Sequence, residues 1–176
     1  MHFSAQQLDR AVGVVLASAA GDALGSQYEF GPSLDDSVTP QFGRGCFGHA
    51  VGEWTDDTSM AMPLLQALAR GDSLDDAAVL ARVVGEWREW SKTALDVGTQ
   101  TRSVLSQLRD PITEHATLAA SRAVHERVGR SGGNGSLMRT GPLALGYLDR
   151  SPANLAATAA RVARLTHWED DNADAS

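Results

Sequence analysis

Apolar residues recur every three or four positions along most of the chain, which is the spacing of one face of an α-helix. The first such run predicts a helix that Ser4 can cap and that ends near Gly25. Its expected apolar face consists of Leu8, Val12, Val15 and Ala19. The pattern therefore predicts an amphipathic helix at the start of the chain.

Further runs of the same period follow after a gap. Helices are expected over about 56–69, 74–90, 99–108, 113–128 and 137–148, and a last one is expected to open at Pro152. Pro63 predicts a kink or an irregular start in the second helix. No apolar run approaches the 18 to 20 residues of a membrane span. The pattern predicts one compact, multi-helix, all-α domain over residues 1–176.

The interval between the first two helices has a different composition. Residues 31–52 are rich in Gly, Pro, Ser and Asp, which break long elements, although a short hairpin over 38–42 is compatible with the pattern. This interval is expected to form a long loop over a functional site. Trp87 and Trp90 could stack on an adenine ring, but at helical spacing we expect core packing instead.

Composition and charge narrow the functional classes. The 176 residues are 43% hydrophobic, which suffices for a core. The net charge of −7 argues against nucleic acid as a partner. A single cysteine, Cys46, excludes an intrachain disulfide and favours a cytoplasmic location. Cys46 and His49 have a spacing seen in zinc sites, but no second pair completes such a site.

The segment GEWTDDTSM contains the strongest candidate chemistry. Thr55, Asp56 and Asp57 offer three consecutive oxygen donors of the kind that Mg²⁺ and Mn²⁺ prefer. The same residues also suit a helix start, because threonine is a good N-cap and aspartates favour the positive end of the helix dipole. From these residues alone, both interpretations stay open.

Three other segments carry polar residues beside apolar helices. GDALGSQYEF contains Asp22 and Glu29, SGGNGSLMRTGPLAL places a glycine-rich turn before an apolar run, and RLTHWEDDNADAS contains His167. Free backbone N–H groups in such a turn can bind a phosphate at a helix N-terminus, although most glycine-rich turns are simple connections.

These four segments, in this order, resemble the ADP-ribosylglycohydrolase family, which includes the dinitrogenase reductase-activating glycohydrolases. The resemblance implies an all-α fold with a two-metal Mg²⁺ or Mn²⁺ centre. It also implies hydrolysis of the bond that joins ADP-ribose to a protein side chain or a small acceptor. Thr55, Asp56 and Asp57 match the metal-binding motif of the family. Glu29 matches the acidic residue that orients substrate or water as a general base.

The resemblance assigns the substrate to the later segments. Residues that match the loop around the diphosphate and ribose, and the histidine that approaches them, are Asn134, Gly135, Ser136, Met138 and His167. Alternatives remain: Glu29 could pair with an arginine, and His167 could pack on Trp168. Asp22 is expected to bond backbone at a helix end, whereas Arg139 could pair with phosphate or with an acidic helix face.

One motif of the family is missing. No Asp-x-Asp-Thr sequence occurs in the 176 residues, although family members use such a motif for the remaining metal ligands. The chain is therefore expected to be the N-terminal portion of such a domain, with an exposed apolar face and self-association as consequences. The alternative function is a non-catalytic fragment or a structural relative similar to the lens crystallin of this fold.

Overall fold

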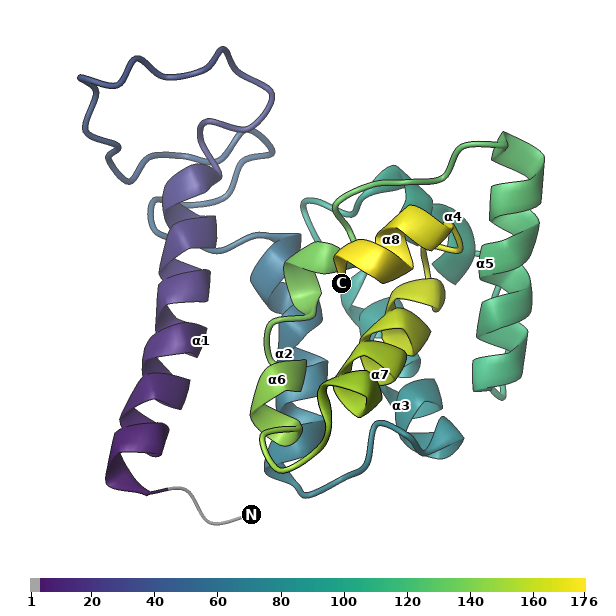
Figure 1. The fold of residues 1–176 in the computed structure, drawn as a ribbon. Helices are drawn as coiled ribbons and strands as arrows, with labels where there is room; N and C mark the ends of the chain where they lie inside the picture. Colours follow the sequence, from purple (N-terminus) through teal and green to yellow (C-terminus); the bar gives the residue numbers. More distant parts are fainter. Residues whose placement is uncertain (1–3) are drawn as a thin grey trace.

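The computed structural model describes residues 4–176, and this part of the chain contains helices and no β-strand (Figure 1). The all-α expectation is confirmed. The elements are α1 (Ala5–Gly25), α2 (Asp56–Ala69), α3 (Ala77–Trp90), α4 (Thr99–Leu105), α5 (Glu114–Val128), the 3₁₀ helix η1 (Leu137–Arg139), α6 (Leu143–Gly146), α7 (Pro152–Arg164) and α8 (Asp170–Ala175). No helix in residues 4–176 combines the length and the apolarity needed to cross a bilayer.

Helix α1 lies beside the body of the molecule (Figure 1). It starts as expected, because the Ser4 hydroxyl accepts from the Gln7 backbone N–H and the Gln7 side chain bonds back to the Ser4 N–H. Its apolar side chains stay exposed, with exposed fractions of 53% for Leu8 and 63% for Leu16. This exposure is the physical basis for the expected self-association, which stays a prediction.

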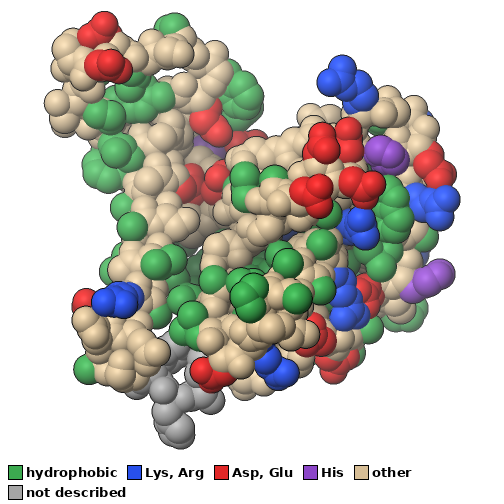
Figure 2. Space-filling view, viewed as in Figure 1, with side chains coloured by type: hydrophobic (Ala, Val, Ile, Leu, Met, Phe, Trp, Pro, Cys, Tyr) green, Lys and Arg blue, Asp and Glu red, His purple; other side chains and the backbone are tan. Residues whose placement is uncertain are grey.

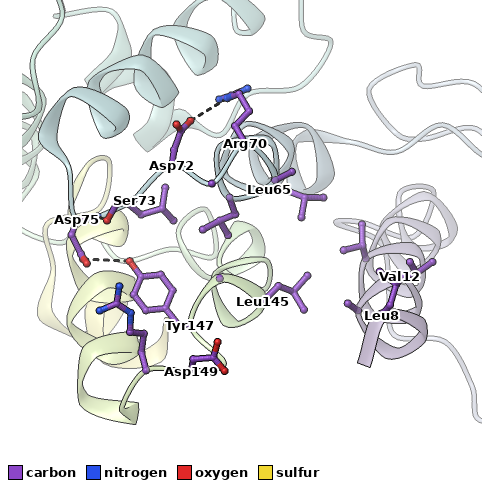
Figure 3. Close-up of a pocket in the computed structure, with 18 of the residues that line it drawn as sticks. Leu8, Val12, Leu65, Arg70, Asp72, Ser73, Asp75, Leu145, Tyr147 and Asp149 are labelled. Atoms are coloured by element: carbon purple, nitrogen blue, oxygen red, sulfur yellow. Dashed lines mark hydrogen bonds and ion pairs between the residues drawn. The ribbon is translucent and has the colours of Figure 1, made fainter. Parts of the chain in front are cut away.

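A groove of about 1080 Å³ separates α1 from the body. Leu8 and Val12 of α1 lie across it from Leu65 of α2 and Leu145 of α6, and Tyr147 lines its floor (Figure 3). The groove is mainly apolar. It lies along α1 and does not include the GEWTDDTSM segment.

The core is formed mainly by α2, α3 and α7. Its fully buried members include Met60, Leu64, Leu74, Leu80, Val83, Val84, Trp87, Val162 and Leu165. The Trp87 ring is completely buried, and its Nε1 donates to the Met60 carbonyl at 2.8 Å. The expectation that Trp87 belongs to the core is therefore confirmed, and Trp90 packs against the same cluster.

Several expected elements differ in the structure. The helix expected over 137–148 is divided into η1 and α6, because Pro142 lacks a backbone N–H and disfavours the helical conformation at Gly141. Helix α3 begins at Ala77, where Asp76 caps it. No strand forms over 38–42, and α2 continues through Pro63. Helix α8 was not expected, because its sequence has no apolar period.

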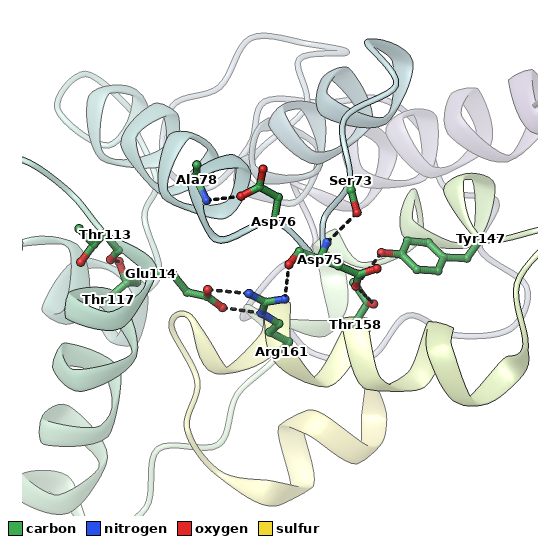
Figure 4. A network of polar contacts seen from close by, with 10 residues as sticks. All are labelled: Ser73, Asp75, Asp76, Ala78, Thr113, Glu114, Thr117, Tyr147, Thr158 and Arg161. Atoms are coloured by element: carbon green, nitrogen blue, oxygen red, sulfur yellow. Dashed lines mark hydrogen bonds and ion pairs between the residues drawn. The ribbon is translucent and has the colours of Figure 1, made fainter.

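A polar network ties α7 to two other parts of the body (Figure 4). Arg161 binds the Glu114 carboxylate of α5 with two hydrogen bonds of 2.5 and 2.6 Å, and it also donates to the Asp75 carbonyl. The Asp75 carboxylate accepts from the hydroxyls of Thr158 and Tyr147. The network is half-buried and closed, which marks it as structural.

Two leucine truncations test this division into a body and an outlying helix. Leu80→Ala should lower the free energy of unfolding by about 2–5 kcal/mol, because it leaves a cavity in the core. Leu16→Ala, on exposed α1, should change it by less than about 0.5 kcal/mol. Urea denaturation followed by circular dichroism measures both. Equal losses in the two variants would contradict the position of α1.

Candidate functional site

The carboxylate of Asp22 joins the end of α1 to the start of α2. It accepts the backbone N–H of Thr55 at 3.0 Å and that of Thr58 at 3.0 Å. It also accepts both threonine hydroxyls, at 2.7 and 2.6 Å. The expectation that Asp22 bonds backbone is confirmed, but the backbone belongs to the first turn of the next helix. A carboxylate in this place also suits the helix dipole.

Thr55 occupies the N-cap position of α2, as the capping interpretation predicted. Its side chain does not cap the helix, however, because its hydroxyl proton goes to Asp22. The capping acceptor for the N–H of Thr58 is Asp22 itself. The Thr55 hydroxyl oxygen keeps its lone pairs for another ligand.

Asp56 and Asp57 follow in the first turn of α2, where acidic side chains gather in the hollow between α1 with its loop and the body (Figure 2). Burial, followed by the charges of Asp96 and Asp57, raises the pKa of Asp56 to about 7. Burial and the charge of Asp22 raise the pKa of Asp57. Carboxylates that perturb one another in a hollow are typical of functional sites.

Glu29 lies in the turn after α1 and belongs to the same cluster. Partial burial and the charges of Asp96, Asp57 and Asp22 raise its pKa, whereas His49 lowers it. No arginine forms an ion pair with Glu29 in the described part of the chain. The salt-bridge alternative is therefore not found there.

Two members of the cluster were not predicted as site residues. Asp96 precedes α4, and burial raises its pKa, whereas His49 and Arg102 lower it. His49 comes from the long loop, is almost completely buried, and its Nδ1 has no hydrogen-bond partner in residues 4–176. The sequence offered His49 only in a zinc-like spacing with Cys46 and gave no signal for Asp96, so the fold is what places both residues in this cluster. Cys46 contacts the carbonyls of Ser26 and Glu29 instead of completing a zinc site.

The donor chemistry of the cluster fits a hard divalent cation. Thr55, Asp56 and Asp57 are neighbouring oxygen donors, and a cation would offset the burial and the neighbouring negative charges that raise the pKa values of the two aspartates. Among residues 4–176, no three His, Cys, Asp or Glu side chains converge closely enough to hold an ion unaided. Complete coordination would therefore need water, substrate or further protein ligands.

The glycine-rich turn and His167 meet on the other side of the site. A Cβ atom on Gly135 would lie 2.7 Å from Cε1 of His167, so only glycine lets the backbone pass this close to the ring. A Cβ atom on Gly133 would lie 3.7 Å from Nε2 of the same ring. Burial and the charge of Arg139 lower the pKa of His167 to about 3, which keeps the imidazole neutral.

Helix α8 braces this turn. The Asn172 side chain donates to the Gly133 carbonyl and to the Ser136 hydroxyl, and Glu169 accepts the Ser131 N–H. Ser136 is thus buried and bonded within the protein, whereas Asn134 stays exposed. Met138 packs against the core.

Gly98 and Thr101, at the start of α4, connect the two sides. A Cβ atom on Gly98 would lie 4.0 Å from both Oδ2 of Asp56 and Oγ1 of Thr101. The Thr101 hydroxyl in turn lies 3.5 Å from the Cβ position of Gly135. The first turn of α4 therefore lies between Asp56 of the acidic cluster and Gly135 of the glycine-rich turn.

Arg139 forms no ion pair with an acidic side chain in residues 4–176. Its guanidinium is completely buried and stacks on the Trp87 ring at 4.2 Å. Its Nη2 donates to the Val162 carbonyl and to the Thr166 hydroxyl. Burial lowers the pKa of Arg139 to about 9, so the side chain stays charged at neutral pH. Trp168 contacts Arg164, with 5.9 Å between the guanidinium carbon and the ring centre.

Comparisons with known proteins agree on one family. The sequence model of the ADP-ribosylglycohydrolase family matches residues 4–176. The ADP-ribosylarginine hydrolase Tri1 of Pseudomonas putida is 36% identical over 145 residues, which cover 80% of this chain and 37% of that protein. The ADP-ribosyl-[dinitrogen reductase] glycohydrolase of Rhodospirillum rubrum is 32% identical over 167 residues, covering 90% of this chain and 51% of that protein.

A solved structure described as an ADP-ribosylglycohydrolase-related protein complex superposes with a TM-score of 0.63 and 29% sequence identity. The match covers 94% of this chain and 52% of that chain. The chain thus spans about a third to a half of the length of these relatives.

The Asp22 carboxylate can be tested by amide substitution. Asp22→Asn leaves one oxygen acceptor for four donors and should cost about 1.5–3 kcal/mol of unfolding free energy in urea denaturation. Asp9→Asn, on the exposed part of the same helix, is the matched control and should change it by less than about 0.5 kcal/mol. An unchanged Asp22→Asn variant would disprove the role of Asp22 in joining the helices.

The raised pKa of Asp56 predicts that the free energy of unfolding depends on pH. Its pKa rises from 3.8 to about 7 on folding, so its stabilising contribution is complete below pH 3.8 and is lost as the pH rises through 7. With chelator present, Asp56→Asn should therefore raise the free energy of unfolding at pH 8 by on the order of 1–3 kcal/mol. It should give no gain near pH 4. Thermal melts at both pH values measure this effect, and the exposed Asp149→Asn variant is the control. Equal pH dependence in the two variants would contradict the raised pKa of Asp56.

Proposed function

The chain belongs to the ADP-ribosylglycohydrolase family, and we propose that the protein hydrolyses the glycosidic bond between ADP-ribose and a modified protein side chain or small acceptor. The observation that carries this proposal is the position of Gly98 and Thr101, which lie between Asp56 of the acidic cluster and Gly135 of the glycine-rich turn. A diphosphate sugar needs both parts, because its anionic end and its reacting carbon require different surroundings.

We propose that Thr55, Asp56 and Asp57 hold Mg²⁺ or Mn²⁺, one or both ions of a two-metal centre. Their oxygen donors and the raised pKa values of both aspartates support this assignment. A bound ion would orient the ribose hydroxyls and lower the pKa of a coordinated water. The Thr55 hydroxyl donates its proton to Asp22, which leaves the lone pairs of the hydroxyl oxygen available to the ion.

Glu29 is the proposed general base. Cleavage of a ribosyl bond develops positive charge at the anomeric carbon and requires a water positioned opposite the leaving group. A carboxylate at the edge of the acidic cluster, with a raised pKa and no arginine partner in residues 4–176, can accept a proton from such a water. Asp96 and His49 adjust the charge around it.

The proposed substrate contacts are on the opposite side. Backbone N–H groups around Asn134 and Gly135 can bind the diphosphate or ribose oxygens, and neutral His167 faces the same space. Ser136 and Met138 support this turn through Asn172 and the core. The names of the relatives support a protein substrate modified on a side chain, and the single cysteine supports a cytoplasmic location.

Calorimetry and an activity assay test the proposal together. Titration of the chain with Mg²⁺ or Mn²⁺, with and without ADP-ribose, should show saturable binding that Asp56→Ala/Asp57→Ala weakens at least about tenfold, or about 1.4 kcal/mol. Release of ADP-ribose from an ADP-ribosylated arginine peptide should fall in parallel. Glu29→Gln should retain ion binding but lose most of the turnover.

The neighbouring aspartates of the exposed loop provide the matched control. Asp35→Ala/Asp36→Ala removes the same charge outside the cluster and should change neither binding nor turnover. A folded chain that binds no ion and no ADP-ribose would favour the non-catalytic alternative.

A further inference from the structure

The Thr166 hydroxyl lies between Arg139 and His167. The Arg139 Nη2 donates to Thr166 Oγ1 at 2.8 Å, and the same oxygen lies 2.8 Å from Nδ1 of His167. Thr166 and Arg139 are completely buried, and His167 is nearly so. The three polar groups therefore form a chain that ends at the proposed substrate site.

The proton positions in this chain follow from its donors and acceptors. A guanidinium only donates, so Thr166 Oγ1 accepts from Arg139 and must direct its own proton elsewhere. Within residues 4–176, the His167 Nδ1 atom is the only acceptor at hydrogen-bond distance from that hydroxyl. A buried hydroxyl that leaves its hydrogen bond unmade destabilises the fold. Nδ1 is therefore the acceptor, and the proton of the neutral ring lies on Nε2.

The fixed charge of Arg139 acts in the same direction. Together with burial, it disfavours a protonated imidazole, which would carry a second positive charge and a second donor toward Thr166. Arg139 is itself held in place by the Trp87 ring and by the Val162 carbonyl at the end of α7. The chain of Arg139, Thr166 and His167 is therefore anchored in the core.

The free nitrogen of His167 faces the glycine-rich turn. Nε2 has no hydrogen-bond partner in the described residues, and the protein does not enclose this atom completely. It therefore keeps accessible surface. The Cβ positions of Gly133 and Gly135 lie 3.7 and 3.0 Å from it, so the turn leaves room at this atom that larger residues would fill.

We propose that Arg139 and Thr166 are positioning residues that hold His167 in its Nε2–H form, so that it presents a neutral hydrogen-bond donor to an oxygen atom of the bound ligand. The identity of that ligand, an ADP-ribosyl group, rests on the proposed function. The tautomer itself does not, because it follows from bonds within the protein.

Nitrogen-15 NMR of histidine-labelled protein tests the tautomer without a ligand. In the wild-type chain, two-bond proton–nitrogen correlations should identify His167 as the Nε2–H form over neutral pH. Thr166→Val should lower the ratio of Nε2–H to Nδ1–H by roughly five- to tenfold, because one hydrogen bond is lost. Thr166→Ser, which keeps the hydroxyl, should retain the wild-type ratio, as should the exposed control Thr93→Val.

The outcomes separate this proposal from the function. An Nδ1–H ring in wild type or in Thr166→Ser, or an unchanged ratio in Thr166→Val, would overturn the tautomer proposal. If Thr166→Val does not fold, the first two spectra still decide. Titration with ADP-ribose is the second measurement: Thr166→Val should bind several-fold more weakly than Thr166→Ser. An Nε2–H ring in a chain that binds no ADP-ribose would contradict the proposed function alone.

Discussion

The site depends on one carboxylate that binds two threonines from another helix. Asp22 and Thr55 are separated by 33 positions, yet five hydrogen bonds from four donors join Thr55 and Thr58 to Asp22. These bonds fix where α2 begins relative to where α1 ends. Asp56 and Asp57 are thereby directed into the hollow that Glu29 borders, and their mutual repulsion is maintained because the helix start cannot move away.

The second half of the site is built differently. The glycine-rich turn is held by hydrogen bonds with Asn172 of α8 and with Glu169, the residue before α8. His167 is held from the core, through Thr166 and Arg139, while the turn passes over its ring. One half is therefore organised by a surface carboxylate and the other by a buried cation, and α4 connects them.

The sequence predicted the parts of this arrangement that local rules determine. Caps and apolar period identified α1, α2, α5 and α7, and Trp87 was correctly expected in the core. The roles of Glu29, Thr55, Asp57 and His167 rested on family resemblance, and they stay predictions.

The missed features have physical reasons. Asp96 stands outside any motif, and the spacing of His49 from Cys46 pointed to zinc instead of this cluster. Only long-range folding gives the two residues their charged neighbours. Helix α8 lacks an apolar period because its short sequence, DDNADA, is mostly acidic or polar, although the helix packs beside α7. An exposed apolar face was expected, but the sequence could not show that it lies on α1, whose apolar side chains remain exposed within residues 4–176.

The loop between α1 and α2 has a consequence for how such proteins can diversify. Its ends are held by Asp22 and the first turn of α2, while most of its interior is irregular and exposed. The entropic cost of closing a flexible loop grows only with the logarithm of its length, by about 0.6 kcal/mol for each doubling. Insertions here would therefore leave the two helix ends in register. The length of this loop could change during evolution with little loss of stability.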